Sequence, residues 1–72
     1  MRKAVLVRRI NRAAAISGIA WGLTRRGANH DVYRLGDLVI PVPRHQEIND
    51  RTAERIFKEC EPQLGPRWWR AK

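Results

Sequence analysis

The spacing of the apolar residues along this chain changes from helical to alternating at Gly18. Before this point Leu6, Ile10, Ala13 and Ala14 recur at offsets of four, seven and eight residues, which is the spacing of one face of an α-helix. After it, apolar and polar residues alternate, as they do in β-strands with one buried face. A chain of 72 residues holds one domain at most. Helix and strands are therefore expected to share a single core.

The helical spacing predicts a first helix over residues 3 to 16. We expect Gly18 to end it, because glycine readily adopts the left-handed conformation found at helix C-termini. The same segment carries three arginines on an arc away from the apolar stripe: Arg8, Arg9 and Arg12. No acid occurs within residues 1 to 30. Such a charge run is typical of a solvated helix face, and also of a surface that binds polyanions.

Three short strands are predicted after the first helix, over residues 19–27, 30–35 and 37–44. Gly-Ala-Asn at 27–29 and Gly-Asp at 36–37 supply turns, so both connections are expected to be tight antiparallel hairpins. Pro41 and Pro43 lack a backbone donor, which either places the third strand at an edge of the sheet or ends it there. In the first strand, alternation puts three apolar residues on one side: Ile19, Trp21 and Leu23.

A last helix is predicted from about residue 49, where either Asn49 or Asp50 can act as the N-cap and Ile48 can pack against the first turn. Pro62 is expected to end it. Its buried stripe consists of Ala53, Ile56, Phe57 and Cys60. The order helix, three antiparallel strands, helix predicts an α+β sandwich with both helices on one sheet face.

The domain is expected to span residues 1–62, followed by a basic tail over residues 63–72. Trp68 and Trp69 of this tail suit three interpretations: stacking on nucleic-acid bases, contact with a partner protein, or packing back on the domain.

The charge of the chain favours a polyanionic partner. Lys and Arg number 15 against 7 Asp and Glu, which gives a net charge of +8, and arginine outnumbers lysine by 12 to 3. Arginine suits bidentate contact with phosphate, so nucleic acid is the expected partner. The residues predicted to contact it are Arg8, Arg9, Arg12, Arg25, Arg26, Arg34, Arg44 and His45. His45 lies in a predicted loop and is equally typical of a plain surface histidine.

The numbers of cysteines and histidines and the length of the apolar segments bear on the location of the protein and on its cofactors. Cys60 is the single cysteine, so no internal disulfide is possible, and no segment approaches the roughly 20 apolar residues of a membrane span. We expect a soluble, cytoplasmic protein that does not lie on a membrane, because its apolar stripes are needed for the core. One cysteine and two histidines do not supply a normal zinc site, and no glycine-rich phosphate loop is present. No cofactor or metal is expected.

His30 is the candidate for chemistry. It opens the second predicted strand directly after the glycine turn and is flanked by Arg25, Arg26 and Arg34. Histidine exchanges protons near neutral pH, and RNA carries its own nucleophile in the 2′-hydroxyl, so one histidine and several arginines suffice for RNA cleavage. Asp31 is a poor orienter for that ring, because neighbours on a strand point to opposite faces. The alternative hypothesis is a non-catalytic RNA-binding module, in which His30 is one more polar contact.

The stretches "RRGANHDVYR" and "VIPVPRHQEIN", followed by a closing helix, resemble the HicA toxins, small mRNA interferases. The resemblance covers residues 3 to 62 and implies a double-stranded-RNA-binding-domain-like fold of order α-β-β-β-α. It also implies that His30 is the catalytic histidine and that Gly27 and Asn29 shape its turn. A HicB-type antitoxin is the implied partner, which would cover the site in a hetero-oligomer. Ala28 stands where the family usually has serine.

Overall fold

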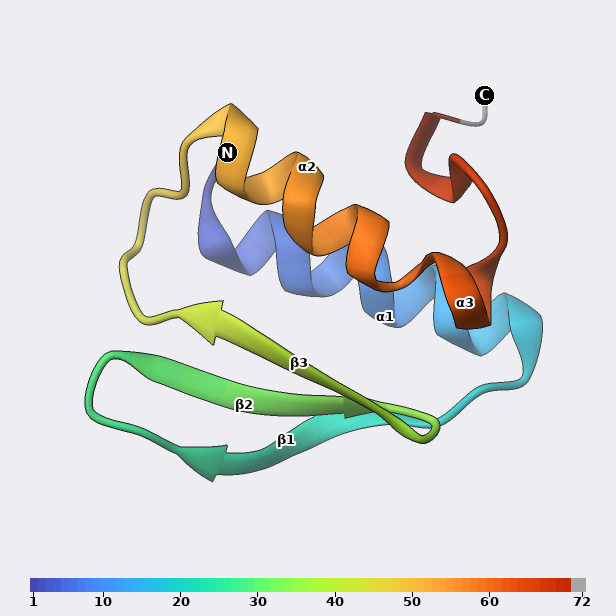
Figure 1. Ribbon diagram of the computed structural model, residues 1–72, viewed down its shortest axis with the longest axis horizontal. Coiled ribbons are helices and arrows are strands. Elements are labelled where there is room, and N and C mark those ends of the chain that lie inside the picture. The colour runs from blue at the N-terminus through green and yellow to red at the C-terminus, as the bar shows by residue number, and fades with distance from the viewer. Residues whose placement is uncertain (71–72) are drawn as a thin grey trace.

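The computed structural model describes residues 1–70 and has two layers (Figure 1). One layer is a three-stranded sheet, and the other is formed by helices that lie on a single face of it. The elements follow in the order α1 Lys3–Ser17, β1 Trp21–Arg26, β2 His30–Leu35, β3 Leu38–Pro43, α2 Asp50–Glu59, α3 Glu61–Leu64 and a 3-10 helix at Trp68–Arg70. The predicted α+β fold, with α1 and α2 on one sheet face, is confirmed.

The sheet is antiparallel throughout, with the strand order β1-β2-β3. β3 is an edge strand, one of the two outcomes predicted from Pro41 and Pro43, since neither residue has an N–H to offer a further strand. Both predicted hairpin turns are present. Gly36 in the second turn has φ +59°, a conformation that glycine adopts without steric penalty.

Helix α1 ends where the sequence predicts. Gly18 has φ +71°, and its N–H donates to the carbonyls of the last turn. The next amide, Ile19 N–H, donates to Ala14 O at 2.8 Å, so the carbonyls of Ala14 and Ala15 at the end of the helix have partners. This closure turns the chain from the helical layer into β1.

The core lies between the helices and the inner sheet face. Its buried residues are Leu6, Ile10, Ala14, Leu35, Ile40, Val42, Ile48, Ala53, Ile56, Phe57 and Cys60. They include the whole predicted stripe of α2, which is therefore confirmed. Cys60 is fully buried, and burial raises the pKa of its thiol to about 12, so it serves as a small apolar core residue.

Leu23 lies on the same sheet face as Trp21, as the alternation predicts, but it is not part of the buried core. Trp21 packs against the core and stacks on Tyr33 with ring centroids 4.6 Å apart, but Leu23 remains 42% exposed. The reason is that β1 is an edge strand, so Leu23 has a neighbouring strand on one side only. The register also shifts between Leu23 and Arg25, a β-bulge that the sequence analysis did not predict.

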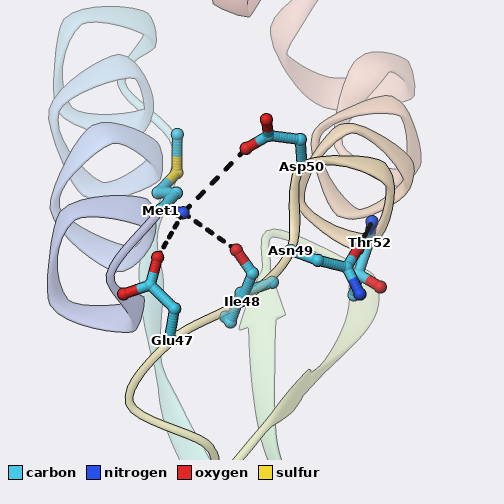
Figure 2. A network of polar contacts seen from close by, with 6 residues as sticks. All are labelled: Met1, Glu47, Ile48, Asn49, Asp50 and Thr52. Carbon is cyan, nitrogen blue, oxygen red and sulfur yellow. Dashed lines mark hydrogen bonds and ion pairs between the residues drawn. The ribbon is translucent and has the colours of Figure 1, made fainter.

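Helix α2 begins with Asn49 as its N-cap, which decides between the two candidates. The Asn49 side chain accepts a hydrogen bond from Thr52 N–H at 2.8 Å. Figure 2 shows this cap beside Met1, whose amino group contacts Glu47 at 2.8 Å and donates to Ile48 O at 2.9 Å. The start of α1 and the start of α2 are thereby held together. The hydrogen bond from this amino group is the main cause that lowers the pKa of Glu47.

Replacing the cap tests this local structure. Asn49→Ala removes the acceptor for an orphan N–H, and we expect the free energy of unfolding to fall by about 1 kcal/mol. Urea denaturation measures it. The matched control is Asn11→Ala, at an exposed position inside α1, where alanine is the better helix former and no loss is expected. Equal losses in both variants would contradict the capping role.

The chain re-enters a helix after α2, which corrects the role predicted for Pro62. Helix α2 ends at Glu59, and Pro62 lies at the start of the short helix α3. Proline suits the first turn of a helix because an N–H there has no partner within the helix. Pro62 therefore marks a new helix as well as the end of the previous one.

Residues 63–70 of the tail pack back on the helical layer, which is one of the three interpretations open for its tryptophans; positions 71 and 72 lie outside the described residues. Trp68 Nε1 donates to Phe57 O at 2.8 Å, and its ring meets the Phe57 ring edge-on at 5.1 Å between centroids. Arg9 of α1 contacts both Trp69 and Phe57. It donates to Trp69 O at 2.8 Å, and its guanidinium lies 5.2 Å from the centre of the Phe57 ring. Trp68 and Trp69 are thus extensions of the core.

Candidate active site

His30 lies at the end of the sheet, on the face that the helices leave open. It is the first residue of β2, pairs with Pro43 of β3 and is exposed. The next residue, Asp31, is buried on the helix side, which fixes the opposite direction for the imidazole. Asp31 therefore does not orient the His30 ring, as the alternation predicts.

The turn before His30 requires glycine at position 27. Gly27 N–H donates to His30 O at 2.8 Å, and a Cβ on Gly27 would lie 2.5 Å from the same oxygen. No side chain fits in that space without moving the backbone. The Arg44 guanidinium closes the turn from outside through Nη1, which donates to Gly27 O at 3.0 Å, and Arg44 N–H donates to Asn29 O at 3.2 Å.

Asp31 contacts positively charged side chains on the helix side of this turn. Lys3 Nζ lies 2.6 Å from Asp31 Oδ2, and Arg44 Nε lies 3.4 Å from Oδ1. Arg26 is its cross-strand partner on β1. The hydrogen bond from Lys3 is the main cause that lowers the pKa of Asp31, burial opposes it, and the charges of Lys3, Arg44 and Arg26 add to the lowering. One carboxylate thus holds several cations in place.

Sequence reasoning missed Lys3 and the role of Asp31. Lys3 comes from the start of α1 and meets Asp31 only through the tertiary fold. The available signal was the position of Asp31 itself, an acid at an inward position of a strand, since buried carboxylates need charged or hydrogen-bonding partners.

The structure divides the predicted RNA-binding residues into separate groups. Arg25 and Arg34 lie on the open sheet face with His30, while Arg26 and Arg44 lie at the same end of the sheet on the helix side. Arg8 and Arg12 are exposed in the helical layer, and Arg9 packs on the tail. His45 lies in the loop after β3, beside a small hollow of about 80 Å³ at the start of α2. The group nearest the candidate site is therefore Arg25, Arg26 and Arg44, while Arg34 lies towards the other end of β2.

Several helices and strands begin or end at the end of the molecule that carries His30. The β1–β2 turn, the end of β3 and the first turns of α1 and α2 lie together there (Figure 1). Cations from three parts of the chain lie at this end: Arg2 and Lys3 at the start of α1, Arg26 at the end of β1, and Arg44 after β3. Within residues 1–70 no group of three His, Cys, Asp or Glu side chains lies close enough to hold a metal ion.

No protein-family model, curated protein or solved structure matches this chain. The resemblance to HicA toxins stays a prediction. Along the described part of the chain, no helix combines the length and the hydrophobicity that crossing a membrane requires.

Changing Gly27 tests the geometry of the turn. We expect Gly27→Ala to destabilise the protein by about 1–3 kcal/mol, because the new methyl group forces the His30 carbonyl aside. Thermal unfolding monitored by circular dichroism measures the loss. Gly22→Ala is the matched control in the same hairpin, since no atom lies within 4 Å of a Cβ built there. If both variants are tolerated equally, the turn is not as tight as described.

The Asp31 cluster predicts a pH dependence of stability. The folded-state pKa of Asp31 is lowered, so its contribution is present above the unfolded pKa of about 3.9 and is lost as the pH falls through that value towards the folded pKa. Asp31→Asn is expected to be less stable at neutral pH and to lose less stability on acidification. Urea midpoints measured between about pH 6 and pH 3 give this comparison. Asp37→Asn, at an exposed turn acid, is expected to follow the wild type; if Asp31→Asn does so too, the cluster does not stabilise the fold.

Proposed function

We propose that this chain is a metal-independent endoribonuclease that cuts single-stranded RNA, with His30 transferring a proton in the reaction. The observation that carries the proposal is the placement of His30: exposed at the rim of an open sheet face, after a turn held by Arg44. Arg25 of β1 lies on the same face and pairs with Val32, two residues after His30. Arg34 shares this face but lies four residues along β2, about 13 Å away, so Arg25 suits a phosphate near the reacting bond and Arg34 a more distant one.

The chemistry needs only groups that RNA and this site supply. The 2′-hydroxyl attacks the adjacent phosphorus, forming the O2′–P bond, while the P–O5′ bond breaks. The 2′-oxygen loses its proton and the departing 5′-oxygen gains one, leaving a 2′,3′-cyclic phosphate and a 5′-hydroxyl. His30 either accepts the first proton or delivers the second, and water completes the exchange. The arginines stabilise the charge that develops on the phosphoryl oxygens.

We propose further that the chain acts as the toxin of a toxin–antitoxin pair in the cytoplasm. A ribonuclease that recognises RNA mainly through phosphate contacts has little sequence selectivity, so a cell that makes it must hold it inactive. The resemblance to HicA toxins supports a HicB-type antitoxin as the inhibitor. An exposed histidine at the rim of the sheet is accessible to such a protein.

The test compares cleavage of an RNA and of a DNA that have the same nucleotide sequence. Purified protein is incubated with a labelled single-stranded RNA and with the DNA of the same sequence, both in the presence of a chelator. We expect fragments with cyclic phosphate and 5′-hydroxyl ends from the RNA and none from the DNA. Cleavage of both would exclude the 2′-hydroxyl as nucleophile. Bound but intact RNA would overturn the nuclease and favour the non-catalytic RNA-binding module.

A further inference from the structure

A second basic feature lies on the helix side of the His30 turn. A hollow of about 250 Å³, here called the α1 hollow, lies between the start of α1 and the segment after β3. Its lining residues are Arg2, Lys3, Ala4, Arg44 and Gln46. Three of the five are cations and none is an acid, so the lining favours an anion.

The lining of the α1 hollow is held in place before any ligand arrives. Lys3 N–H donates to Gln46 O at 2.8 Å, which fixes the two sides of the hollow to each other. Lys3 Nζ and Arg44 Nε are anchored by Asp31, which is only 4% exposed. Holding the cations in advance reduces the entropy lost when an anion binds.

The charge balance leaves the α1 hollow positive. Among residues 1–70, Asp31 is the one carboxylate in salt-bridge contact with Lys3 and Arg44. Glu47 is the other acid nearby, opposite Arg2 and paired with the Met1 amino group. Against these two acids stand four side-chain cations, Arg2, Lys3, Arg26 and Arg44. The volume also limits the ligand, since pockets for drug-sized molecules enclose about 300–1,000 Å³. About 250 Å³ suits one phosphate group with a few waters better than a whole nucleotide.

The α1 hollow and His30 share the same turn. Arg44 lines the hollow and donates through Nη1 to Gly27 O in the β1–β2 turn, and Gly27 N–H in turn donates to His30 O. A polynucleotide that crosses this end of the sheet therefore meets His30 on one side and the hollow on the other. We propose that the α1 hollow binds a second backbone phosphate of the RNA, apart from the one that is cut, an inference that rests on the proposed function. Free phosphate shares this chemistry and is the other possible source of the ligand.

Two measurements on the His30→Ala protein test the subsite without any cleavage. In the first, inorganic phosphate is titrated into ¹⁵N-labelled protein, and amide shifts are expected at Lys3, Ala4, Arg44 and Gln46. In the second, the affinity for a single-stranded RNA is measured against salt with and without Arg2→Gln. Losing one phosphate contact is expected to reduce the slope of log K against log salt by about 0.7.

The matched control is Arg55→Gln, an exposed arginine in the middle of α2 that removes the same charge away from the α1 hollow. Its slope is expected to equal that of the parent protein. Amide shifts at the hollow together with a smaller slope for Arg2→Gln alone support the proposal. Amide shifts with an unchanged slope would mean that the hollow takes free phosphate, and no amide shifts would mean that it takes none; either result overturns it.

The outcome is separable from that of the proposed function. If the wild-type protein does not cut RNA but Arg2→Gln still reduces the slope, the nuclease fails and the phosphate subsite stands as part of an RNA-binding surface. If the wild-type protein cuts RNA but the slope is unchanged, the nuclease stands and the subsite fails.

Discussion

His30→Ala is expected to slow RNA cleavage by about 10²- to 10⁴-fold, the usual contribution of a general acid or base. The fold should be unaffected, because His30 is exposed on the open sheet face and only its backbone carbonyl takes part in the turn. Most of the RNA affinity should also remain, since the arginines supply the phosphate contacts. Single-turnover cleavage rates at saturating protein, with circular dichroism of both proteins, provide the measurement.

His45 offers the matched control for this experiment. It is the other histidine of the chain, is also exposed, and lies in the loop after β3 instead of on the strand that carries the candidate site. Under saturating protein, a loss of binding does not affect the rate, so His45→Ala is expected to cleave as fast as the wild type. A folded His30→Ala protein that cleaves at the wild-type rate would exclude a catalytic role for His30.

Phe57→Ala is expected to lower the free energy of unfolding by about 3–5 kcal/mol, as large-to-small changes at buried aromatic positions do. Phe57 is 2% exposed and joins α2 to both tail tryptophans and to Arg9 of α1. Small domains have stabilities of about 5–15 kcal/mol, so this change removes a large part of the total. Urea unfolding followed by tryptophan fluorescence measures it.

Phe57→Leu keeps an apolar side chain at the same position and provides the comparison for Phe57→Ala. It is expected to lose clearly less stability, because it fills more of the space and gives up mainly the aromatic contacts with Trp68 and Trp69. If Phe57→Ala costs no more than about 1 kcal/mol, the tail and α2 do not form one core with α1, and the packing described for the tail is wrong.

The order of the elements could be predicted from the sequence because the signals are local. The spacing of Leu6 and Ile10, the glycine at position 18 and the two prolines of β3 each act on the few residues around them. The exposure of Leu23 could not be predicted in this way, because it depends on which strand lies at the edge and on a bulge in β1. The packing of the tail likewise depends on two helices that are distant in sequence.

The candidate site was predictable in part. His30, the glycine turn and the arginines around them are adjacent in sequence, so their common location follows from local structure. The contacts of Asp31 could not be predicted, because Lys3 and Arg44 reach Asp31 from the start of α1 and from the segment after β3. The separation of Arg8 and Arg12 from the His30 face also depends on how the layers pack.

The most direct test of the central claim is made in cells. The wild-type chain and His30→Ala are expressed to equal levels from an inducible promoter, and growth and the integrity of a reporter mRNA are followed in the same cultures. The account predicts growth arrest with fragmented mRNA in the wild-type culture, and normal growth with intact mRNA in the His30→Ala culture. Growth with intact mRNA in both cultures, with folded protein present, would contradict a histidine-dependent ribonuclease toxin.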